Sequence, residues 1–171
     1  MLSNNINIDL GRGGILRPLQ KKDITQEYID GINAPEIRKF LSAPNAELQT
    51  FETVRLFVEQ NNSAKDAILF GLFVNKIHCG NVRLHEITTE KAYIGIALFL
   101  KKVWRQNWGS TAISASVQYA NQVLHIKQIL AGIDDNNIAS KKSFAKAGFR
   151  MMPHKIFPTK SSNSHFWQYI I

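Results

Sequence analysis

The segment from Lys101 to Ser110 has the composition of an anion-binding loop. Basic side chains at Lys101, Lys102 and Arg105 precede a helical pattern that begins near Trp108. The first turn of a helix leaves backbone N–H groups without partners, and the helix dipole adds partial positive charge at the same end. A phosphate or pyrophosphate group suits such a site. The alternative is an ordinary strand-to-helix connection, because the glycine pattern of a phosphate loop is incomplete.

A second polar loop, Asp134 to Asn137, separates a strand pattern from a helical pattern. The two aspartates could suggest a metal site. However, Asn137 stands where a helix needs a cap, so a turn is the better interpretation. The five histidines and the single cysteine, Cys79, form no zinc-binding motif. We therefore expect no metal site.

The elements that position these two loops follow from hydrophobic spacing. Apolar or alternating runs predict strands, and apolar residues three and four apart predict helices. The expected strands cover residues 15–19, 68–74, 77–84, 92–100, 129–133, 149–157 and 165–171. The expected helices cover residues 23–33, 35–41, a segment after Thr50, 108–125 and 138–147. Residues 68–100 read as an antiparallel meander, and three early glycines make residues 1–13 a flexible lead-in.

Two helix starts and one helix face give specific expectations. Asp23 is expected to cap the first helix and Thr50 the third, because both side chains can accept a hydrogen bond from the first turn. The apolar residues of the third helix share one face, which predicts their burial. These residues are Phe51, Val54, Phe57 and Val58.

Length and composition indicate a single domain over residues 1–171. Hydrophobic residues make up 44% of the chain and charged residues 20%, which excludes disordered and collagen-like chains. The start of the chain lacks a signal-peptide pattern, and no apolar run is long enough to cross a bilayer. One cysteine favours a reducing compartment. We therefore expect a cytoplasmic protein with no membrane partner.

The net charge of +8 indicates an anionic partner. Residues 1–66 carry eight Lys and Arg against nine Asp and Glu, whereas residues 67–171 carry thirteen against four. The positive charge is dispersed, and there is no polybasic run or RNA-binding aromatic signature. Nucleic-acid binding is therefore not favoured, and the excess charge accompanies the two polar loops.

Four linked motifs resemble those of the GNAT acetyltransferase superfamily, and within it the RimJ/RimL-like branch. The first, WRQNWGSTA at 104–112, resembles the family's acetyl-CoA pyrophosphate loop. DDNNIAS at 134–140 and KAGF at 146–149 resemble the family's D-P-E-N-x-A-S and K-x-G-F motifs at the expected separation. Tyr119 and Ala120 are the fourth linked piece. NAPEIRKFL at 33–41 is a weaker similarity, to the first helical pair of the branch. Linked motifs at correct spacing are far more specific than any one of them.

The resemblance implies an α/β (α+β) fold, with a mixed, splayed central sheet of about six to seven strands flanked by helices. It also implies that acetyl-CoA enters a split between the strands at 92–100 and 129–133. Backbone groups of Ala97, Leu98 and Phe99 would pair with the pantetheine arm, and Asn137 would bond its amide. Lys142 is the candidate contact for the 3′-phosphate among the lysines at 141, 142 and 146, for which a solvated helix face is the default interpretation. The amides that would hold the pyrophosphate belong to Arg105, Gln106, Asn107, Trp108, Gly109 and Ser110.

Three positions depart from the family pattern. Arg105 and Asn107 replace the first two glycines of the loop, and asparagine tolerates the left-handed conformation better than most residues do. Phe144 stands where many GNAT enzymes have a catalytic tyrosine. By resemblance to the RimL-type enzymes, Ser140 is the candidate acid or sulfur contact. Glu86 and His85, at the end of a hairpin strand, are the candidates for the base, with Glu86 preferred; the alternatives are a solvated strand end and a water molecule in place of the base.

The resulting expectation is an acetyl-CoA-dependent N-acetyltransferase that acts on a primary amine. The amine could belong to a protein N-terminus, including that of a ribosomal protein, or to a small molecule such as an amino sugar. A non-catalytic acyl-CoA-binding module is the alternative from another class, motivated by the missing tyrosine and glycines. A homodimer is one option for its assembly.

Overall fold

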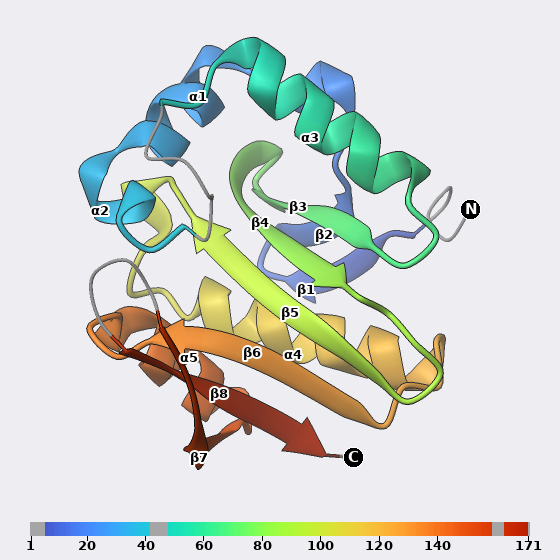
Figure 1. The fold of residues 1–171 in the computed structure, drawn as a ribbon. Coiled ribbons are helices and arrows are strands. Elements are labelled where there is room, and N and C mark those ends of the chain that lie inside the picture. The colour runs from blue at the N-terminus through green and yellow to red at the C-terminus, as the bar shows by residue number, and fades with distance from the viewer. Residues whose placement is uncertain (1–5, 42–47, 159–162, 171) are drawn as a thin grey trace.

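The strand patterns assemble into one eight-stranded sheet in the order β1-β2-β3-β4-β5-β6-β8-β7 (Figure 1). The computed structural model describes residues 6–41, 48–158 and 163–170. Every described pairing is antiparallel except that of β5 with β6. The strands are β1 (Ile8–Gly11), β2 (Gly14–Pro18), β3 (Ile68–Val74), β4 (Ile77–His85), β5 (Lys91–Leu98), β6 (Gln128–Asp134), β7 (Arg150–Pro158) and β8 (Asn163–Ile170).

Helices cover both faces of this sheet. They are α1 (Gln26–Asn33), α2 (Pro35–Arg38), α3 (Phe51–Ser63), α4 (Trp108–Gln122) and α5 (Ile138–Lys146). The expected α/β class with a mixed sheet is confirmed, with one strand more than the six to seven expected. No helix among the described residues is long and apolar enough to cross a membrane.

The additional strand is β1, and it corrects the expectation of a flexible lead-in over residues 1–13. Residues 8–11 pair with β2, and the early glycines form the tight turn between the two strands. Gly11 and Gly13 have φ of 71° and 75°, and Arg12 between them has φ of 50°. A tight hairpin turn requires positive φ, which is why glycines occur there. Residues 1–5 lie outside the described part of the chain.

The expected cap of the first helix is also corrected. Thr25, whose hydroxyl accepts from the Tyr28 amide, caps α1, whereas Asp23 is nearly buried. The Asp23 carboxylate accepts two hydrogen bonds from Arg17, at 2.7 and 2.8 Å, and one from the Gln20 amide at 2.9 Å. Burial acts to raise the pKa of Asp23, but these hydrogen bonds outweigh it and hold the pKa below its usual value.

Helix α3 begins as expected, with the Thr50 hydroxyl accepting from the Thr53 amide. Its apolar face is only half buried. Val54 and Val58 pack with α1 residues over β3, whereas Phe51 is 51% exposed and Phe57 36% exposed. The two phenylalanines lie on opposite flanks of the buried stripe, so both border it without entering it.

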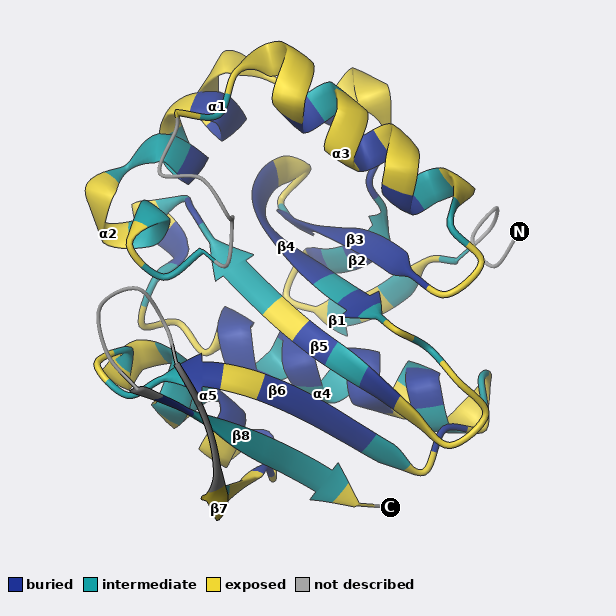
Figure 2. Ribbon diagram, in the orientation of Figure 1, coloured by how far each residue is buried: buried dark blue, intermediate teal, exposed yellow. Residues whose placement is uncertain are grey.

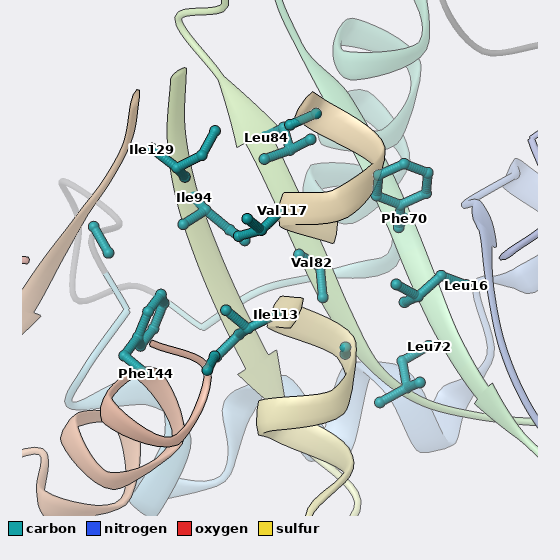
Figure 3. Packing of buried hydrophobic residues seen from close by; sticks show 14 of the residues in the cluster. Leu16, Phe70, Leu72, Val82, Leu84, Ile94, Ile113, Val117, Ile129 and Phe144 are labelled. Carbon is teal, nitrogen blue, oxygen red and sulfur yellow. The ribbon is translucent and has the colours of Figure 1, made fainter. Parts of the chain in front are cut away.

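Helix α4 forms the main core on the other face of the sheet. Its Ile113 and Val117 point at Val82 of β4 and Ile94 of β5, and all four are buried (Figure 3). Phe144 of α5 packs in the same cluster. Full burial of aliphatic side chains of this size contributes about 1.5–3 kcal/mol each. The core therefore holds α4 and α5 firmly against the strands that carry the two polar loops.

A buried polar group interrupts the packing between α1 and β4. The His78 ring is enclosed by Tyr28, Phe73 and Phe99, with ring centroids 4.9–5.0 Å away. Its Nε2 lies 2.8 Å from Oδ1 of Asn81, whose Nδ2 donates to the Tyr28 hydroxyl at 2.7 Å. Burial lowers the pKa of His78, so the ring is neutral at pH 7.

Because the His78 ring is buried, we expect the folded protein to lose stability in mild acid. Below about pH 6.5, the ordinary histidine pKa, the unfolded chain binds a proton that the folded ring resists, so the free energy of unfolding falls as the pH falls. His78→Gln is expected to flatten this dependence by up to about 1.4 kcal/mol per pH unit. Urea denaturation between pH 5 and 8 measures it. The exposed His154→Gln serves as the control, and an unchanged slope in His78→Gln would contradict the assignment.

Candidate active site

The two strands at the centre of the sheet separate after three residue pairs. Lys91 to Tyr93 of β5 pair with Gln128 to Leu130 of β6, and no later pair forms. Beyond that point β5 continues to pair with β4 as far as Leu98, and β6 with β8 as far as Asp134. Figure 1 shows β5 and β6 adjacent where they begin and apart where they end. The expected split is confirmed.

Only alternate residues of β5 turn their backbone N–H and C=O groups toward the split. The Phe99 amide donates to the Cys79 carbonyl at 3.1 Å, and Ala97 pairs with Asn81, so both residues turn their backbone groups toward β4. Alternation along a strand then turns those of Ile96 and Leu98 toward the split. Of the three residues expected here, Leu98 turns its backbone groups toward the split, whereas Ala97 and Phe99 turn theirs toward β4. The contact of these residues with a cofactor stays a prediction.

The loop after β5 has the backbone of a glycine-rich loop without its glycines. Arg105 has φ of 60° and Asn107 has φ of 68°, and these are the two positions where the family pattern has glycine. No described side chain caps α4, and Asn107 occupies its cap position in the left-handed conformation. The amides of Trp108, Gly109 and Ser110 therefore form an uncapped first turn, which favours a bound anion.

The N-terminal hairpin braces this loop. Arg12 donates from Nη2 to the Gln106 carbonyl at 3.2 Å, and its guanidinium lies 4.5 Å from the centre of the Trp108 ring. A Cβ at Gly14 would overlap that ring, so β2 approaches Trp108 as closely as glycine permits. The sequence reasoning missed Arg12, because the residue lies 94 positions before the loop and within the supposed lead-in.

The basic side chains near the loop are arranged differently from the expectation. Lys146 of α5 donates from Nζ to Oδ1 of Asn107 at 2.7 Å. Lys101 forms an ion pair with Glu36 at 2.6 Å, which ties α2 to the loop. Lys142 is exposed on α5 and makes no hydrogen bond or ion pair within the described residues. Lys146, one turn further along the helix, is therefore the lysine that reaches the loop.

Asn137 lies at the end of β6, on the other side of the split. Its Oδ1 accepts from the Ser140 amide at 3.0 Å and so caps α5, as expected. The preceding turn is held by His165, whose Nδ1 lies 2.7 Å from Oδ1 of Asp135. Both Asn137 and Ser140 are half-buried. The cap leaves the Nδ2 amide of Asn137 available to a ligand.

An aromatic row crosses the split on the face of the sheet opposite α4. The His85 ring stacks on Tyr93 with centroids 5.7 Å apart, and Tyr93 meets Phe166 of β8 at 6.1 Å. Gly95 and Gly132, one on each strand of the split, are exposed. Figure 2 shows an exposed segment, in yellow, within each of β5 and β6. A Cβ at Gly95 would meet no atom within 4 Å. We refer to this surface, formed by Tyr93, Gly95, Gly132 and Phe166, as the open face.

Glu86 and His85 lie at the border of the open face. Glu86 has an exposed side chain, and its Oε1 lies 3.4 Å from Nδ1 of His85. Burial lowers the pKa of His85, and the positive charge of Arg83 adds to the effect. The sequence offered His85 as the less favoured candidate for the base, and nothing in the local sequence indicates that its ring stacks on Tyr93.

Comparisons with known proteins agree with this geometry. Residues 15–150 match the family model of the acetyltransferase (GNAT) domain. No curated protein matches the sequence at a significant level. Solved structures do match in fold, and they confirm the sequence resemblance at that level.

Three of these solved structures cover nearly the whole chain. A GNAT-family acetyltransferase from Bacillus anthracis has a TM-score of 0.79 and 20% identity over 96% of this chain and 98% of its own. RimL, the ribosomal L7/L12 α-N-protein acetyltransferase solved with coenzyme A, has a TM-score of 0.84 and 16% identity over 97% of this chain and 98% of its own. The ribosomal-protein-S5-alanine acetyltransferase from Vibrio fischeri has a TM-score of 0.80 and 14% identity over 97% of each chain.

The left-handed Arg105 predicts a stabilising substitution. A side chain in this conformation costs about 1–2 kcal/mol, whereas glycine adopts it freely. Arg105→Gly is therefore expected to raise the free energy of unfolding by about 0.5–1 kcal/mol, measured by urea denaturation. Arg105→Ala is the control, because it removes the charge and keeps the backbone cost. Equal effects of the two variants would show that the charge, not the backbone, is responsible.

Proposed function

The chain belongs to the GNAT acetyltransferase family, and on that premise we propose that it transfers an acetyl group from acetyl-CoA to a primary amine. The observation that carries the proposal is the split between β5 and β6, which has an uncapped helix start on one side and Asn137 on the other. An unpaired strand edge inside a sheet offers hydrogen bonds to an extended amide-bearing chain. The helix start offers amides to a diphosphate.

The residues around the split suit coenzyme A in polarity. Backbone groups of Ile96 and Leu98 and the Asn137 amide would hold the pantetheine arm. The amides of residues 105–110 would hold the pyrophosphate, with Lys146 and Arg12 fixing the loop that presents them. Gly109 has Ser143 Oγ and Leu98 within 3.1–3.4 Å of its Cβ position, so the loop, β5 and α5 meet here without room for a side chain.

Acetyl-CoA supplies an activated acetyl group as a thioester. The chain must then place an amine beside the split, take a proton from it and stabilise the departing sulfur. Ser140, in the first turn of α5 and next to Asn137, is proposed to donate its hydroxyl hydrogen toward the sulfur. Phe144, at the position of the common catalytic tyrosine, is buried against Phe149 and has no group to donate.

The base is proposed to be the pair formed by His85 and Glu86. The neutral His85 ring can accept a proton, and Glu86 at 3.4 Å stabilises the charged form. The ring stacks on Tyr93, the last residue of β5 that pairs with β6, so it lies close to the point where the split opens. Glu86 thus keeps a place in the site, as the partner of the histidine rather than as the sole base.

The proposed acceptor is a primary amine at a protein N-terminus or on a small molecule. The first option is supported by the fold shared with RimL and the S5-alanine enzyme, whose names state protein substrates. Calorimetry with coenzyme A and a thiol-release assay over a broad amine panel test the proposal. Coenzyme A binding without turnover on any amine would favour a non-catalytic module instead. If coenzyme A does not bind, the proposal that the split is its binding site would be wrong.

Asn137→Ser separates the cap of α5 from ligand binding. Serine keeps a helix-capping oxygen but removes the amide donor, so stability should change by less than about 0.5 kcal/mol. The dissociation constant for coenzyme A is expected to rise about five- to tenfold, the worth of one hydrogen bond. Calorimetry measures it, with Asn136→Ser in the same turn as the control. Unchanged affinity would remove Asn137 from the site.

Ser140→Ala tests the proposed contact with sulfur. Loss of an acid that acts only during transfer is expected to lower kcat about 10- to 100-fold while coenzyme A affinity stays the same. Ser143→Ala, one turn further along α5, is the matched control and should leave kcat within about twofold of the wild type. An unaltered kcat in Ser140→Ala would reject the acid role.

A further inference from the structure

Arg83 of β4 is a half-buried cation at the border of the open face. It pairs with Gly95 in the register of β4 and β5, so the two residues lie on the same side of the sheet. Its Nε donates to Oδ1 of Asn61 at 2.7 Å, and its guanidinium carbon lies 5.5 Å from the centre of the Phe57 ring. Both contacts come from α3, which fixes the side chain along one wall of the open face.

Arg83 lacks a carboxylate partner within the described residues, unlike Arg17 of β2 and Arg55 of α3. Arg17 is paired with Asp23, and Arg55 with Glu52 and Glu59. Arg83 forms no ion pair within the described residues, and its two terminal nitrogens form no hydrogen bond there. A partly buried charge is normally compensated by an opposite charge.

Two carboxylates lie near enough to act on Arg83 at longer range. They belong to Asp66, before β3, and Glu86, after β4. Burial nevertheless lowers the pKa of the Arg83 guanidinium despite both of them. The charge is therefore incompletely compensated by the protein itself, and its planar pair of terminal nitrogens matches the geometry of a carboxylate.

Arg83 lies close to the place where the proposed reaction would occur. Gly95 separates Arg83 from the split by one strand, about 5 Å, and its missing side chain leaves the space above it open. His85 follows two residues later on the same strand and the same side of the sheet. A molecule lying over Gly95 could thus reach the split, the His85 ring and the Arg83 guanidinium together.

We propose that Arg83 binds a carboxylate of the acceptor, so that the preferred substrate is an amine that carries a carboxylate a few bonds from the reacting nitrogen. This inference rests on the proposed acetyltransferase function. Asn61 and Phe57 hold the guanidinium in place, and Gly95 leaves room for the substrate between the guanidinium and the split. The carboxylate belongs either to a free amino acid or to an acidic side chain near a peptide N-terminus.

Matched acceptor pairs test the carboxylate. Alanine against alaninamide represents the small amines, and peptides with Asp against Asn at the second position represent protein N-termini. Thiol release should show kcat/KM at least about tenfold higher for the carboxylate member of one pair, as expected for a charge-assisted bidentate contact. The pair that shows the preference identifies the source of the carboxylate. Equal rates within both pairs would overturn the inference.

Substitutions at Arg83 test the residue itself. Arg83→Gln should reduce the preference to about onefold, by lowering the rate on the carboxylate member more than the rate on the amide member. Arg83→Lys should restore part of it, because the charge remains. Lys76→Gln, in the exposed turn between β3 and β4, is the control. A preference that survives in Arg83→Gln would overturn the inference.

A measurement on the unmodified protein guards against misfolding of the variants. N-acetylalanine and N-acetylalaninamide cannot be acetylated again at this nitrogen, so each acts only as a competitor. The carboxylate form should inhibit more strongly, by about tenfold or more, and equal inhibition would count against Arg83. Coenzyme A affinity should be unchanged in Arg83→Gln. Loss of coenzyme A binding in the wild type would instead mark failure of the proposed function.

Discussion

The separation of β5 from β6 is the constraint on which the rest of the molecule depends. A sheet normally satisfies every backbone group of an interior strand, and opening it leaves N–H and C=O groups that must find other partners. Here the cost is confined to the ends of two strands, because each keeps its outer neighbour: β5 keeps β4, and β6 keeps β8. The core beneath the split, including Ile94, Ile113 and Ile133, holds the two halves of the sheet to α4 and α5.

The anion-binding end of the split depends on contacts between distant parts of the chain. Trp108 is buried at the start of α4, where the N-terminal hairpin packs on it through Gly14 and Arg12. Lys146 approaches from α5 and occupies the side-chain oxygen of Asn107. Because Lys146 engages that oxygen, the oxygen does not cap α4, and the first amides of the helix are left to a ligand. The N-terminal hairpin and α5 thus both maintain one uncapped helix end.

Positively charged residues occur at two separate places in the fold. The loop of residues 101–110 has basic side chains beside the helix start, and these account for part of the excess of Lys and Arg in the second half of the sequence. On the open face, the charge that matters is Arg83, together with the neutral His85 next to it. Buried Asp23 and Arg17 neutralise each other farther from the split, beneath α1. A basic composition therefore corresponds here to two local anion sites rather than to one continuous basic surface.

The sequence by itself determined the features that arise from neighbouring residues. Alternation and helical spacing placed seven of the eight strands, Thr50 and Asn137 were recognisable as caps, and the linked motifs at 104–112 and 134–140 indicated the family. These signals are local, because a cap or an amphipathic face needs only a few consecutive residues. The sequence failed at Asp23 and at residues 8–11, where a distant arginine and a neighbouring strand outweighed local preference.

Only the tertiary structure decided which of the candidate residues meet. The backbone groups of Leu98 face the split and those of Phe99 face away from it, because β4 pairs with one side of β5. The tertiary structure brought Arg12 and Lys146 to the loop, and it left Arg83 without a carboxylate beside the open Gly95. Such placements depend on strand register and helix packing between residues far apart in the chain. No spacing within one segment encodes them.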